Sequence, residues 1–474
     1  MSDAYARALD ALSARGPGRM VPDLARITAL VGLLGDPQHA YRCVHVTGTN
    51  GKGSIVRMTS ALLGGVDLRV GTYLSPHLQD VRERIQVDLE PIGPEAFAAV
   101  HAEVERLAAL VDGGNGATAD DAGAQRVTFF EVMTAMALAH LADVAVDVAV
   151  VEVGLGGRWD ATNVVRGDVA VLGPVDLDHT ELLGTTPEAI ADEKLGVVED
   201  GTHVVTAAQR PEVMAMVAAA AERAGGGLTV VGRDVRVLGR GPAPGGQVVD
   251  VDLHGRRLEG LLLPVHGAHQ AENLAAALGA VAALLGPSLD RVADEVLREA
   301  VARVRVPGRL EVVGAGPAVV LDGAHNPHAA AAVAAAVAEL GYRDVVLLLS
   351  CLDDKDVEGV CAALGPVASH VVVAPAPSPR AADPARLAAV ARAVWAPRGV
   401  LVEVAEDVDE GLAMATGVAG PRDAVLVTGS LTAVGAARDR LLPPEGTPLA
   451  PGDVRTLALR PRAGDPGEGA PDLG

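Results

Sequence analysis

Short apolar runs rich in valine alternate along this chain with longer stretches rich in alanine and leucine. Runs of about five apolar residues are typical of buried strands, and the longer stretches are typical of helices. In the first part of the chain we expect strands at 43–47, 146–153 and 169–172. We expect helices at 54–63, 94–110, 128–141 and 271–285. This alternation predicts βαβ units built around a parallel sheet.

Three other segments define the expected domains. Residues 228–265 alternate polar and apolar positions, which predicts a small β-rich subdomain. The sequence VRVPGR at 304–309 is interpreted as a hinge, so the first domain would span 1–303 and a second α/β domain 304–442. Residues 443–474 are rich in Pro, Gly and charge, and we expect a disordered tail there. Strands of the second domain are expected at 319–322, 345–350, 371–374 and 424–428.

Composition narrows the class of partners. Hydrophobic residues make up 49% of the chain and aromatic residues only 2%, so the core must be aliphatic. A net charge of -22 argues against nucleic acid or an anionic membrane as the main partner. Cys43, Cys351 and Cys361 show neither disulfide nor zinc spacing, which favours a reduced, cytoplasmic setting. We expect no membrane span, and we expect a monomer.

The strongest chemical signal is HVTGTNGKGS at 45–54, placed between an expected strand and an expected helix. Glycines let backbone N–H groups surround phosphate oxygens, and the helix N-terminus adds positive charge. Lys52 would contact the β- and γ-phosphates of a nucleotide, and the Ser54 hydroxyl would contact Mg²⁺. Gly53 between these two residues departs from the general phosphate-loop pattern, as does Val46 at its first glycine. The expected nucleotide-binding residues here are Gly48, Thr49, Asn50, Gly51, Lys52, Gly53 and Ser54.

A second signal is VVEVGLGGRWDATN at 150–163. Glu152 would lie at the carboxyl end of a buried strand, where parallel sheets bind ligands. Its carboxylate could hold the same Mg²⁺ that Ser54 contacts, although a Glu capping a turn is the structural alternative. Asp160 and Asn163 could support this site or simply form a turn.

These two motifs resemble those of the Mur-type amide ligases, and most of all the folylpolyglutamate synthase and dihydrofolate synthase family. The resemblance extends over about residues 20 to 440, with Trp159 in place of a usual Leu. It implies an α/β protein with an N-terminal P-loop-type ATPase domain, a small β-rich subdomain and a C-terminal Rossmann-like α/β domain. It also implies ATP and two Mg²⁺ ions as cofactors.

The resemblance assigns further residues to the nucleotide and metal sites. His179, in the LDH segment, would bind metal, and Lys194, in ADEKLGVV, would be carbamylated by CO₂. Carbamylation needs a neutral amine, and therefore a lowered lysine pKa. Asn273, in HGAHQAENL, would hydrogen-bond the adenine.

In the second domain, Arg309 would reach phosphate oxygens beside the hinge, and Asp322 would contact the ribose or nucleotide. His325, in the HNP turn, would accept a proton from the attacking amine. A purely structural turn is the alternative for Asp322 and His325.

The acid substrate would lie near TYLSPHLQDVRERI at 72–85 and TFFE at 128–131, which resemble the family's folate-binding segments. Its expected contacts are Ser75, His77, Arg82 and Phe129. Arg82 and Arg84 could attract the substrate's carboxylate, or they could be surface charge.

The activity implied is an ATP-dependent ligase that joins L-glutamate to dihydropteroate or to tetrahydrofolate through an acyl phosphate. One enzyme could carry out both reactions. A peptidoglycan-precursor ligase is an alternative, but only about 45 residues precede the phosphate loop, too few for its additional domain. A nucleotide-dependent switch without ligase activity is the other alternative.

Overall fold

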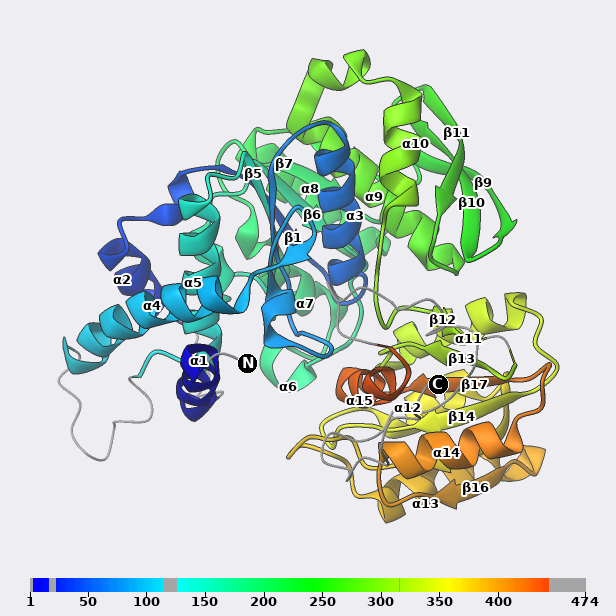
Figure 1. The fold of residues 1–474 in the computed structure, drawn as a ribbon. Helices are drawn as coiled ribbons and strands as arrows, with labels where there is room; N and C mark the ends of the chain where they lie inside the picture. Colours follow the sequence, from blue (N-terminus) through cyan, green and yellow to red (C-terminus); the bar gives the residue numbers. More distant parts are fainter. Residues whose placement is uncertain (1–2, 17–22, 115–125, 315, 443–474) are drawn as a thin grey trace, which may run out of the picture. The chain divides into compact units, whose positions relative to one another are not determined.

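The computed structural model describes residues 3–16, 23–114, 126–314 and 316–442 (Figure 1). The expected tail at 443–474 lies outside the described residues. The chain divides into two compact units, Met1–Val306 and Pro307–Gly474. Each unit is an α/β structure built around its own sheet.

The sheet of the first unit has eight strands in the order β4-β3-β2-β5-β1-β6-β7-β8. Six neighbouring strands, β2, β5, β1, β6, β7 and β8, run parallel to one another. The pairs β2–β3 and β3–β4 are antiparallel, so the sheet is mixed rather than wholly parallel. The strands are β1 (Arg42–Thr47), β2 (Val70–Tyr73), β3 (Ile85–Val87), β4 (Glu90–Pro91), β5 (Val148–Glu152), β6 (Val169–Leu172), β7 (His203–Thr206) and β8 (Leu228–Val230).

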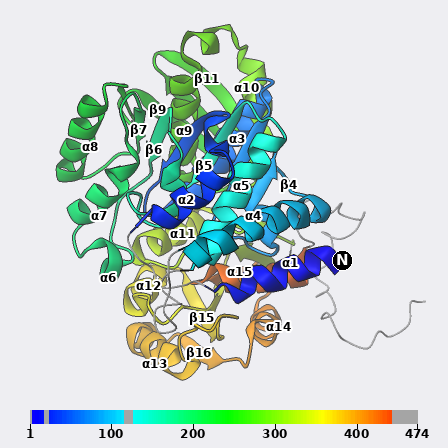
Figure 2. The same ribbon diagram turned by 90° about the vertical axis from the view of Figure 1, so that its left-hand side faces the viewer.

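Helices cover both faces of this sheet. One face packs against α3 (Lys52–Gly65) and α9 (Ala268–Leu285). The opposite face packs against α1 (Asp3–Ala14), α2 (Ala25–Leu33), α4 (Pro94–Gly114) and α5 (Phe129–Asp143), which Figure 2 shows from outside. Farther along the sheet, α7 (Pro187–Lys194) and α8 (Pro211–Ala224) pack on β6 and β7, and α6 (Thr180–Leu183) precedes them. Nearly continuous Val and Ala runs in the strands follow from this coverage on both faces.

A second, antiparallel sheet of three strands lies in the same unit. It consists of β9 (Val235–Ala243), β10 (Gly246–Leu253) and β11 (Arg256–Leu263), and α10 (Asp294–Ala302) packs on it. This sheet accounts for the polar–apolar alternation of the sequence. The subdomain begins later than the predicted residue 228, because β8 at 228–230 pairs with β7 in the large sheet.

Helix α9 and the short 3₁₀ helix after it form one long apolar stretch. Residues 268–291 are long and apolar enough to cross a membrane by length and composition, but 61% of the most apolar window is buried inside the protein. Within α9, Gly279 faces Val205 and Thr229 so closely that a Cβ atom there would lie 3.2 Å from Val205. Its apolar surface is therefore used in packing against the sheet.

The second unit has a six-stranded sheet in the order β12-β13-β17-β14-β15-β16, antiparallel only at β12. Helices α11, α12 and α13 pack on one face, and α14 and α15 pack on the other. The strands are β12 (Glu311–Val313), β13 (Ala318–Leu321), β14 (Val345–Leu349), β15 (Ala368–Val373), β16 (Leu401–Val404) and β17 (Ala424–Thr428). The helices are α11 (Pro327–Glu339), α12 (Val357–Leu364), α13 (Pro384–Trp395), α14 (Val408–Val418) and α15 (Leu431–Leu441).

The two tryptophans of the chain have opposite environments. Trp159, in the segment that follows β5, is 49% exposed. Trp395, at the end of α13, is 1% exposed, and its indole N–H donates to the carbonyl oxygen of Cys361 at 3.0 Å. Each unit therefore contains one tryptophan.

Candidate functional site

Four adjacent parallel strands of the first unit end at the same edge of the sheet. In the order β2-β5-β1-β6, Tyr73 pairs with Val151, Val46 with Glu152, and Thr47 with Leu172. The segments that follow these strands contain the phosphate loop, Glu152, and the residues assigned to metal and acid binding. The carboxyl edge of a parallel sheet is the usual place for a ligand.

The phosphate loop begins at a position where only glycine fits. Gly48 has φ 146°, and a Cβ atom there would lie 2.9 Å from the Cα atom of Gly173. Close approach of the two glycines lets the Thr49 N–H donate to the carbonyl oxygen of Pro174 at 2.9 Å. The Thr49 hydroxyl also donates to the carbonyl oxygen of Asp176, at 2.9 Å. Gly173 is therefore part of the loop's support.

The helix after the loop begins at Lys52, two residues earlier than expected. Its N-cap, Gly51, has φ 82°, a left-handed conformation that glycine adopts without strain. A Cβ atom on Gly51 would lie 2.6 Å from Oδ1 of Asn273, so Asn273 of α9 lies directly beside the loop. The structure thus brings together the loop and the residue assigned to adenine.

Two lysines converge on the first residue of the loop. The Lys52 ammonium donates to the carbonyl oxygens of Gly48 and Thr49, at 3.1 and 3.4 Å. The Lys194 amine, at the end of α7, donates to the same Gly48 oxygen at 2.9 Å. Burial, together with the neighbouring charge of Lys52, lowers the pKa of Lys194 to about 7. A neutral amine at this position is therefore accessible near neutral pH.

Glu152 and Ser54 supply oxygen atoms next to the loop. Both are buried, at 5% and 2% exposure. The Glu152 carboxylate accepts from the backbone N–H of Ser75 at 3.1 Å, and it would lie 3.5 Å from a Cβ atom on Gly53. Carboxylate and hydroxyl oxygens at a helix N-terminus suit a hard cation whose remaining ligands come from phosphates and water.

His179 lies at the N-terminus of α6 in a left-handed conformation, with φ 50°. Its Nε2 lies 3.9 Å from Oδ1 of Asp178, and Asp178 in turn interacts electrostatically with Lys194. Within the described part of the chain, no three side chains of His, Cys, Asp or Glu form a group able to hold a metal by themselves. A metal there would need ligands of another kind.

A buried polar chain connects β1 to the segment after Glu152, and no pattern in the sequence predicted its contacts. Nε2 of His45 lies 2.9 Å from the Thr162 hydroxyl, which donates to Oδ1 of Asp160 at 2.5 Å. Because the hydroxyl donates its hydrogen to Asp160, it accepts from His45, so Nε2 carries the proton. Burial lowers the pKa of His45 to about 3, which keeps the ring neutral. Oδ2 of Asp160 accepts from the N–H of Leu155 at 2.8 Å.

The four residues assigned to the acid substrate are placed differently from one another. His77 and Phe129 both contact Arg84: Nε of Arg84 donates to Nδ1 of His77 at 3.0 Å, and the guanidinium lies 5.2 Å from the Phe129 ring centroid. Ser75 contacts Glu152. Arg82 instead pairs with Asp80 at 2.7 Å, beside the ring of Tyr5.

Arg84 and Arg82 differ in burial and in the residues that they contact. Arg84 is buried at 8% exposure, and desolvation lowers its pKa. Arg82 lies two residues earlier in the same 3₁₀ turn, and its side chain contacts Asp80 instead. The sequence alone does not distinguish the two arginines, because their roles depend on which side of this turn faces the sheet.

In the second unit, the residues after β13 form a compact turn. Asp322, 3% exposed, accepts from the N–H groups of Leu310 and Ala324 at 2.9 and 2.8 Å. Arg309 is adjacent, because its Nη1 would lie 2.9 Å from a Cβ atom on Gly323. Nδ1 of His325 lies 2.9 Å from the carbonyl oxygen of Gly323. Arg309, Asp322 and His325 thus come together in one turn of this unit.

Comparisons with known proteins agree over most of the chain. A family model described as "Mur ligase, glutamate ligase domain" matches residues 308–431. The dihydrofolate synthase/folylpolyglutamate synthase of Mycobacterium tuberculosis is 42% identical over 439 residues, which cover 89% of this chain and 90% of that protein.

Solved structures give the same result. The Mycobacterium tuberculosis folylpolyglutamate synthase complexed with ADP matches with a TM-score of 0.86 and 40% identity, covering 92% of this chain and 98% of that one. Escherichia coli FolC in complex with DHPP and ADP matches with a TM-score of 0.79 and 30% identity, covering 93% and 98%. The resemblance found in the sequence, and the two-domain α/β fold that it implied, are confirmed.

Proposed function

Because the chain belongs to the dihydrofolate synthase/folylpolyglutamate synthase family, we propose that it joins L-glutamate to a pterin- or folate-type acid through an amide bond, with cleavage of ATP to ADP and phosphate. One observation carries this proposal: the phosphate loop, two lysines and a buried carboxylate meet at the carboxyl edge of four adjacent strands. We propose dihydropteroate and tetrahydrofolate as alternative acids for one enzyme, as the double names of several relatives suggest.

ATP would be held by the loop and by Asn273. The N–H groups at the start of α3 and the Lys52 ammonium would contact the phosphates, since both favour negative charge. Asn273, beside Gly51, would hydrogen-bond the adenine. Lys52 would leave its present acceptors on Gly48 and Thr49 to reach the γ-phosphate.

We assign Mg²⁺ to Ser54, Glu152 and His179. The oxygens of Ser54 and Glu152 suit this ion, and ATP phosphates would complete its coordination. When bound, Mg²⁺ would neutralise negative charge that develops on the transferred phosphoryl group. Glu152 is held ready by the N–H of Ser75, which orients one carboxylate oxygen.

Lys194 is proposed to be carbamylated. Its neutral amine would attack the carbon of CO₂, forming a C–N bond and releasing one proton, so that the neutral amine becomes an anionic carbamate. The lowered pKa of Lys194 favours the neutral amine that this reaction needs. The carbamate would then attract a second Mg²⁺ ion. Carbon-13 NMR after exposure to ¹³CO₂ tests this, because Lys194→Met should lose the carbamate signal of wild type.

The reaction would proceed in two steps. A carboxylate oxygen of the acid attacks the γ-phosphorus, and ADP leaves, giving an acyl phosphate. The glutamate amine then attacks the acyl carbon, the amine loses a proton, and phosphate leaves. Activation is needed because a carboxylate repels nucleophiles, and the chain's positive groups lower the barrier by stabilising the developing charge.

In the second unit we propose that Arg309 contacts phosphate oxygens and that Asp322 contacts the ribose or nucleotide. His325 is proposed as the proton acceptor. A carbonyl oxygen only accepts hydrogen bonds, so Nδ1 of His325 carries the proton toward Gly323 and Nε2 is the basic nitrogen.

We place the acid substrate beside Ser75, His77 and Phe129. Arg82 and Arg84 are both candidates for the substrate carboxylate, and the pairing of Arg82 with Asp80 favours Arg84. A guanidinium between a ring nitrogen and an aromatic face is well placed to attract a carboxylate attached to a flat aromatic group.

An ATPase assay tests the proposal. ADP release should require both L-glutamate and dihydropteroate or tetrahydrofolate, and mass spectrometry should find products one glutamate heavier. ADP release that ignores both acceptors would favour a nucleotide-dependent switch instead. A peptidoglycan-precursor ligase would require a UDP-sugar acid in place of the pterin. The cytoplasmic location and the monomeric state stay predictions, and sedimentation velocity checks the latter.

A further inference from the structure

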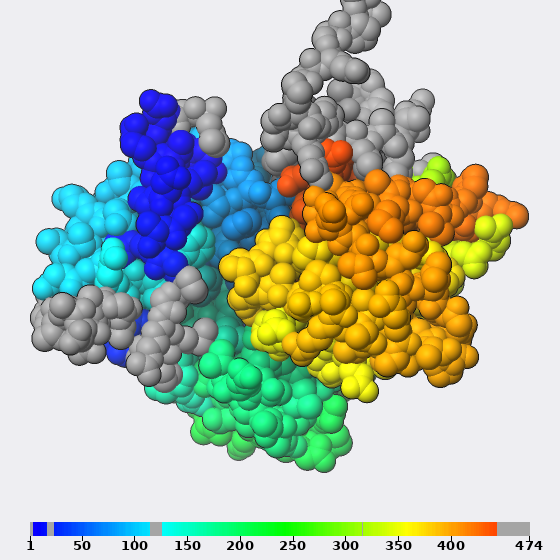
Figure 3. All heavy atoms as spheres, turned by 90° about the horizontal axis from the view of Figure 1, so that it is seen from below, coloured from blue at the N-terminus to red at the C-terminus, as the bar shows by residue number. Residues whose placement is uncertain are grey.

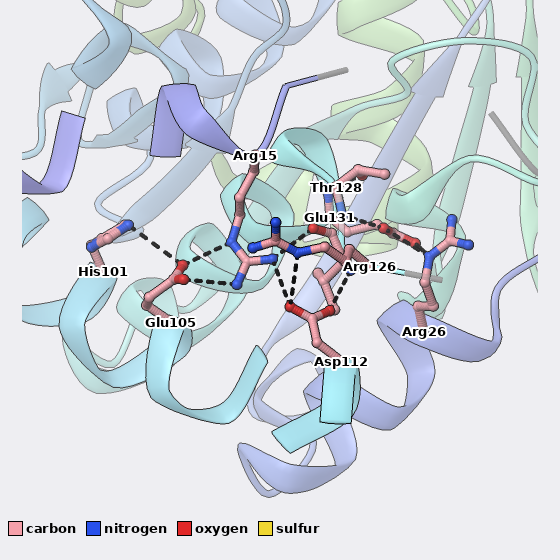
Figure 4. Close-up of polar contacts among 9 residues, drawn as sticks. Arg15, Arg26, His101, Glu105, Asp112, Arg126, Thr128 and Glu131 are labelled. Carbon is pink, nitrogen blue, oxygen red and sulfur yellow. Dashed lines mark hydrogen bonds and ion pairs between the residues drawn. The ribbon is translucent and has the colours of Figure 1, made fainter. Parts of the chain in front are cut away.

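A partly buried ionic cluster lies outside the phosphate-loop site and connects the residue after α1 with α4 (Figure 4). The Arg15 side chain is 2% exposed, and its Nε and Nη2 donate to the two carboxylate oxygens of Glu105, each at 2.8 Å. Its Nη1 lies 3.2 Å from Oδ2 of Asp112. His101 and Arg126 complete the cluster, each 3.8 Å from one of these carboxylates.

This cluster holds one peptide unit from both sides. Nη1 of Arg15 donates to the carbonyl oxygen of Val127 at 2.7 Å. Oδ1 of Asp112 accepts from the N–H of the same Val127, also at 2.7 Å. In addition, the N–H of Phe129 donates to the carbonyl oxygen of Gly16, just after α1, at 3.2 Å. Both polar backbone groups of Val127 are thus bound to charged side chains.

The clamped residue directly precedes the N-terminus of α5. Thr128 is the N-cap and forms a capping box with Glu131, whose carboxylate also accepts from Nε of Arg26 at 3.0 and 3.2 Å. The next residues, Phe129 and Phe130, face the candidate acid site. Arg84 lies over the Phe129 ring, and the Phe130 ring lies 6.2 Å from that of Tyr73.

Arg15 lies directly after α1, and its side chain is the most buried of the cluster. This helix packs on α4 and α5, and Figure 3 shows it, in dark blue, with its outer side exposed. Arg15 and Gly16, the two residues after α1, hydrogen-bond to the segment that leads into α5. An ion pair that is partly removed from water adds little net stability compared with an apolar contact of the same size, so net stability alone does not account for this cluster.

We propose that Arg15, together with Glu105 and Asp112, is a positioning residue that sets the aromatic wall of the acid site by clamping Val127. The cluster touches no reacting group; it acts through Phe129 and Arg84. This inference rests on the proposed function, in which Phe129 borders the acid. Loosening the clamp should therefore weaken binding of the pterin acid while leaving ATP binding unchanged.

The test compares Arg15→Lys and Glu105→Gln with wild type. Lysine keeps the charge of Arg15 but lacks the planar fork that reaches Glu105 and Val127 together. Glutamine keeps the shape of Glu105 but removes its charge. Arg233→Lys is the matched control, because Arg233 also pairs through two nitrogens with one carboxylate, that of Asp234, but is exposed.

We expect both cluster variants to raise the KM for dihydropteroate by about tenfold, because small displacements of a binding wall are costly. The KM for ATP should stay within about twofold of wild type, and Arg233→Lys should resemble wild type in both. Circular dichroism and the Kd of a non-hydrolysable ATP analogue report folding. Should Arg15→Lys fail to fold, Glu105→Gln decides the question.

An unchanged KM for dihydropteroate in folded variants would overturn the inference. So would equal changes in the KM values for ATP and for the acid, since that would indicate a general loss of structure. Failure of the proposed function is distinguishable, because it would appear in the wild-type arm as absent turnover with either acid.

Discussion

Lys52 and Lys194 donate to the same acceptor, the carbonyl oxygen of Gly48, at 3.1 and 2.9 Å. Two full positive charges so close together repel each other, and one of the two, Lys194, is buried at 3% exposure. Losing the proton of Lys194 relieves both the repulsion and the cost of desolvation. This relationship makes the first residue of the phosphate loop sensitive to the charge of a side chain from another helix, α7.

The first prediction concerns stability and pH. The pKa of Lys194 is about 7 in the folded protein and 10.5 ordinarily. Between these values the unfolded chain holds a proton that the folded chain does not, so raising the pH favours the folded state. The free energy of unfolding of wild type, minus that of Lys194→Met, should therefore increase with pH in this window, by up to about 1.4 kcal/mol per pH unit. Denaturant titrations in CO₂-free buffer measure it.

The comparison with Lys194→Met cancels the other titrating groups, which both proteins share. A difference that stays flat from pH 7 to pH 10.5 would show that Lys194 keeps its ordinary pKa in the folded state. A difference that falls with pH would mean that the folded state stabilises the charged amine.

Lys52→Ala and Glu152→Ala should each lower kcat by about 10²-fold or more, because each removes a group that stabilises charge in the transition state. The fold should persist, since both side chains lie at the end of the sheet rather than in its core. Steady-state kinetics with circular dichroism check both points. Rates like those of wild type in either variant would contradict the assigned role.

Gly48→Ala should abolish nucleotide binding. The new methyl group would lie 2.9 Å from the Gly173 backbone, at a φ of 146° that alanine rarely adopts, so the loop must move. Gly64→Ala is the control, because Gly64 lies in α3 with nothing within 4 Å of its added Cβ atom. It should bind ADP normally and gain about 0.5–1 kcal/mol in stability. Calorimetry of ADP binding distinguishes the two, and normal binding by Gly48→Ala would refute the placement of the loop.

Thr162→Val should destabilise the first unit by about 1–3 kcal/mol, because it leaves the buried His45 and Asp160 without their shared partner. Thr162→Ser retains the hydroxyl and should recover most of the loss. Thermal unfolding of the two variants measures the difference. Equal melting temperatures for Val and Ser at this position would show that the polar chain has no energetic role.

Much of the fold followed from the sequence because its strands are strongly apolar and its helices are rich in alanine. The expected strand at 169–172 and that at 424–428 coincide with β6 and β17. Helix starts were less accurate: α9 begins at Ala268 rather than 271, and α3 at Lys52 rather than 54. Caps depend on glycine dihedral angles, which a sequence pattern does not specify.

The antiparallel edge strands escaped the sequence pattern for another reason. β3 and β4 have three and two residues, too short for any periodicity to appear. Motifs in the sequence identified the candidate site residues, but they did not predict which way each side chain points. Whether Arg82 or Arg84 faces His77 depends on a turn of the backbone, and the chain from His45 to Asp160 joins residues far apart in sequence.

The scarcity of aromatic residues leaves this protein with two built-in fluorescent reporters, one for each unit. Trp159 is half exposed, so its fluorescence should lie at long wavelength and be quenched by solutes in solution. It lies two residues after Gly157, against which the backbone of Lys194 packs. Trp395, sealed within the core of α12 and α13, should emit at short wavelength and resist such quenching. Spectral separation would let each half of the molecule be watched melting on its own, without a dye or a label.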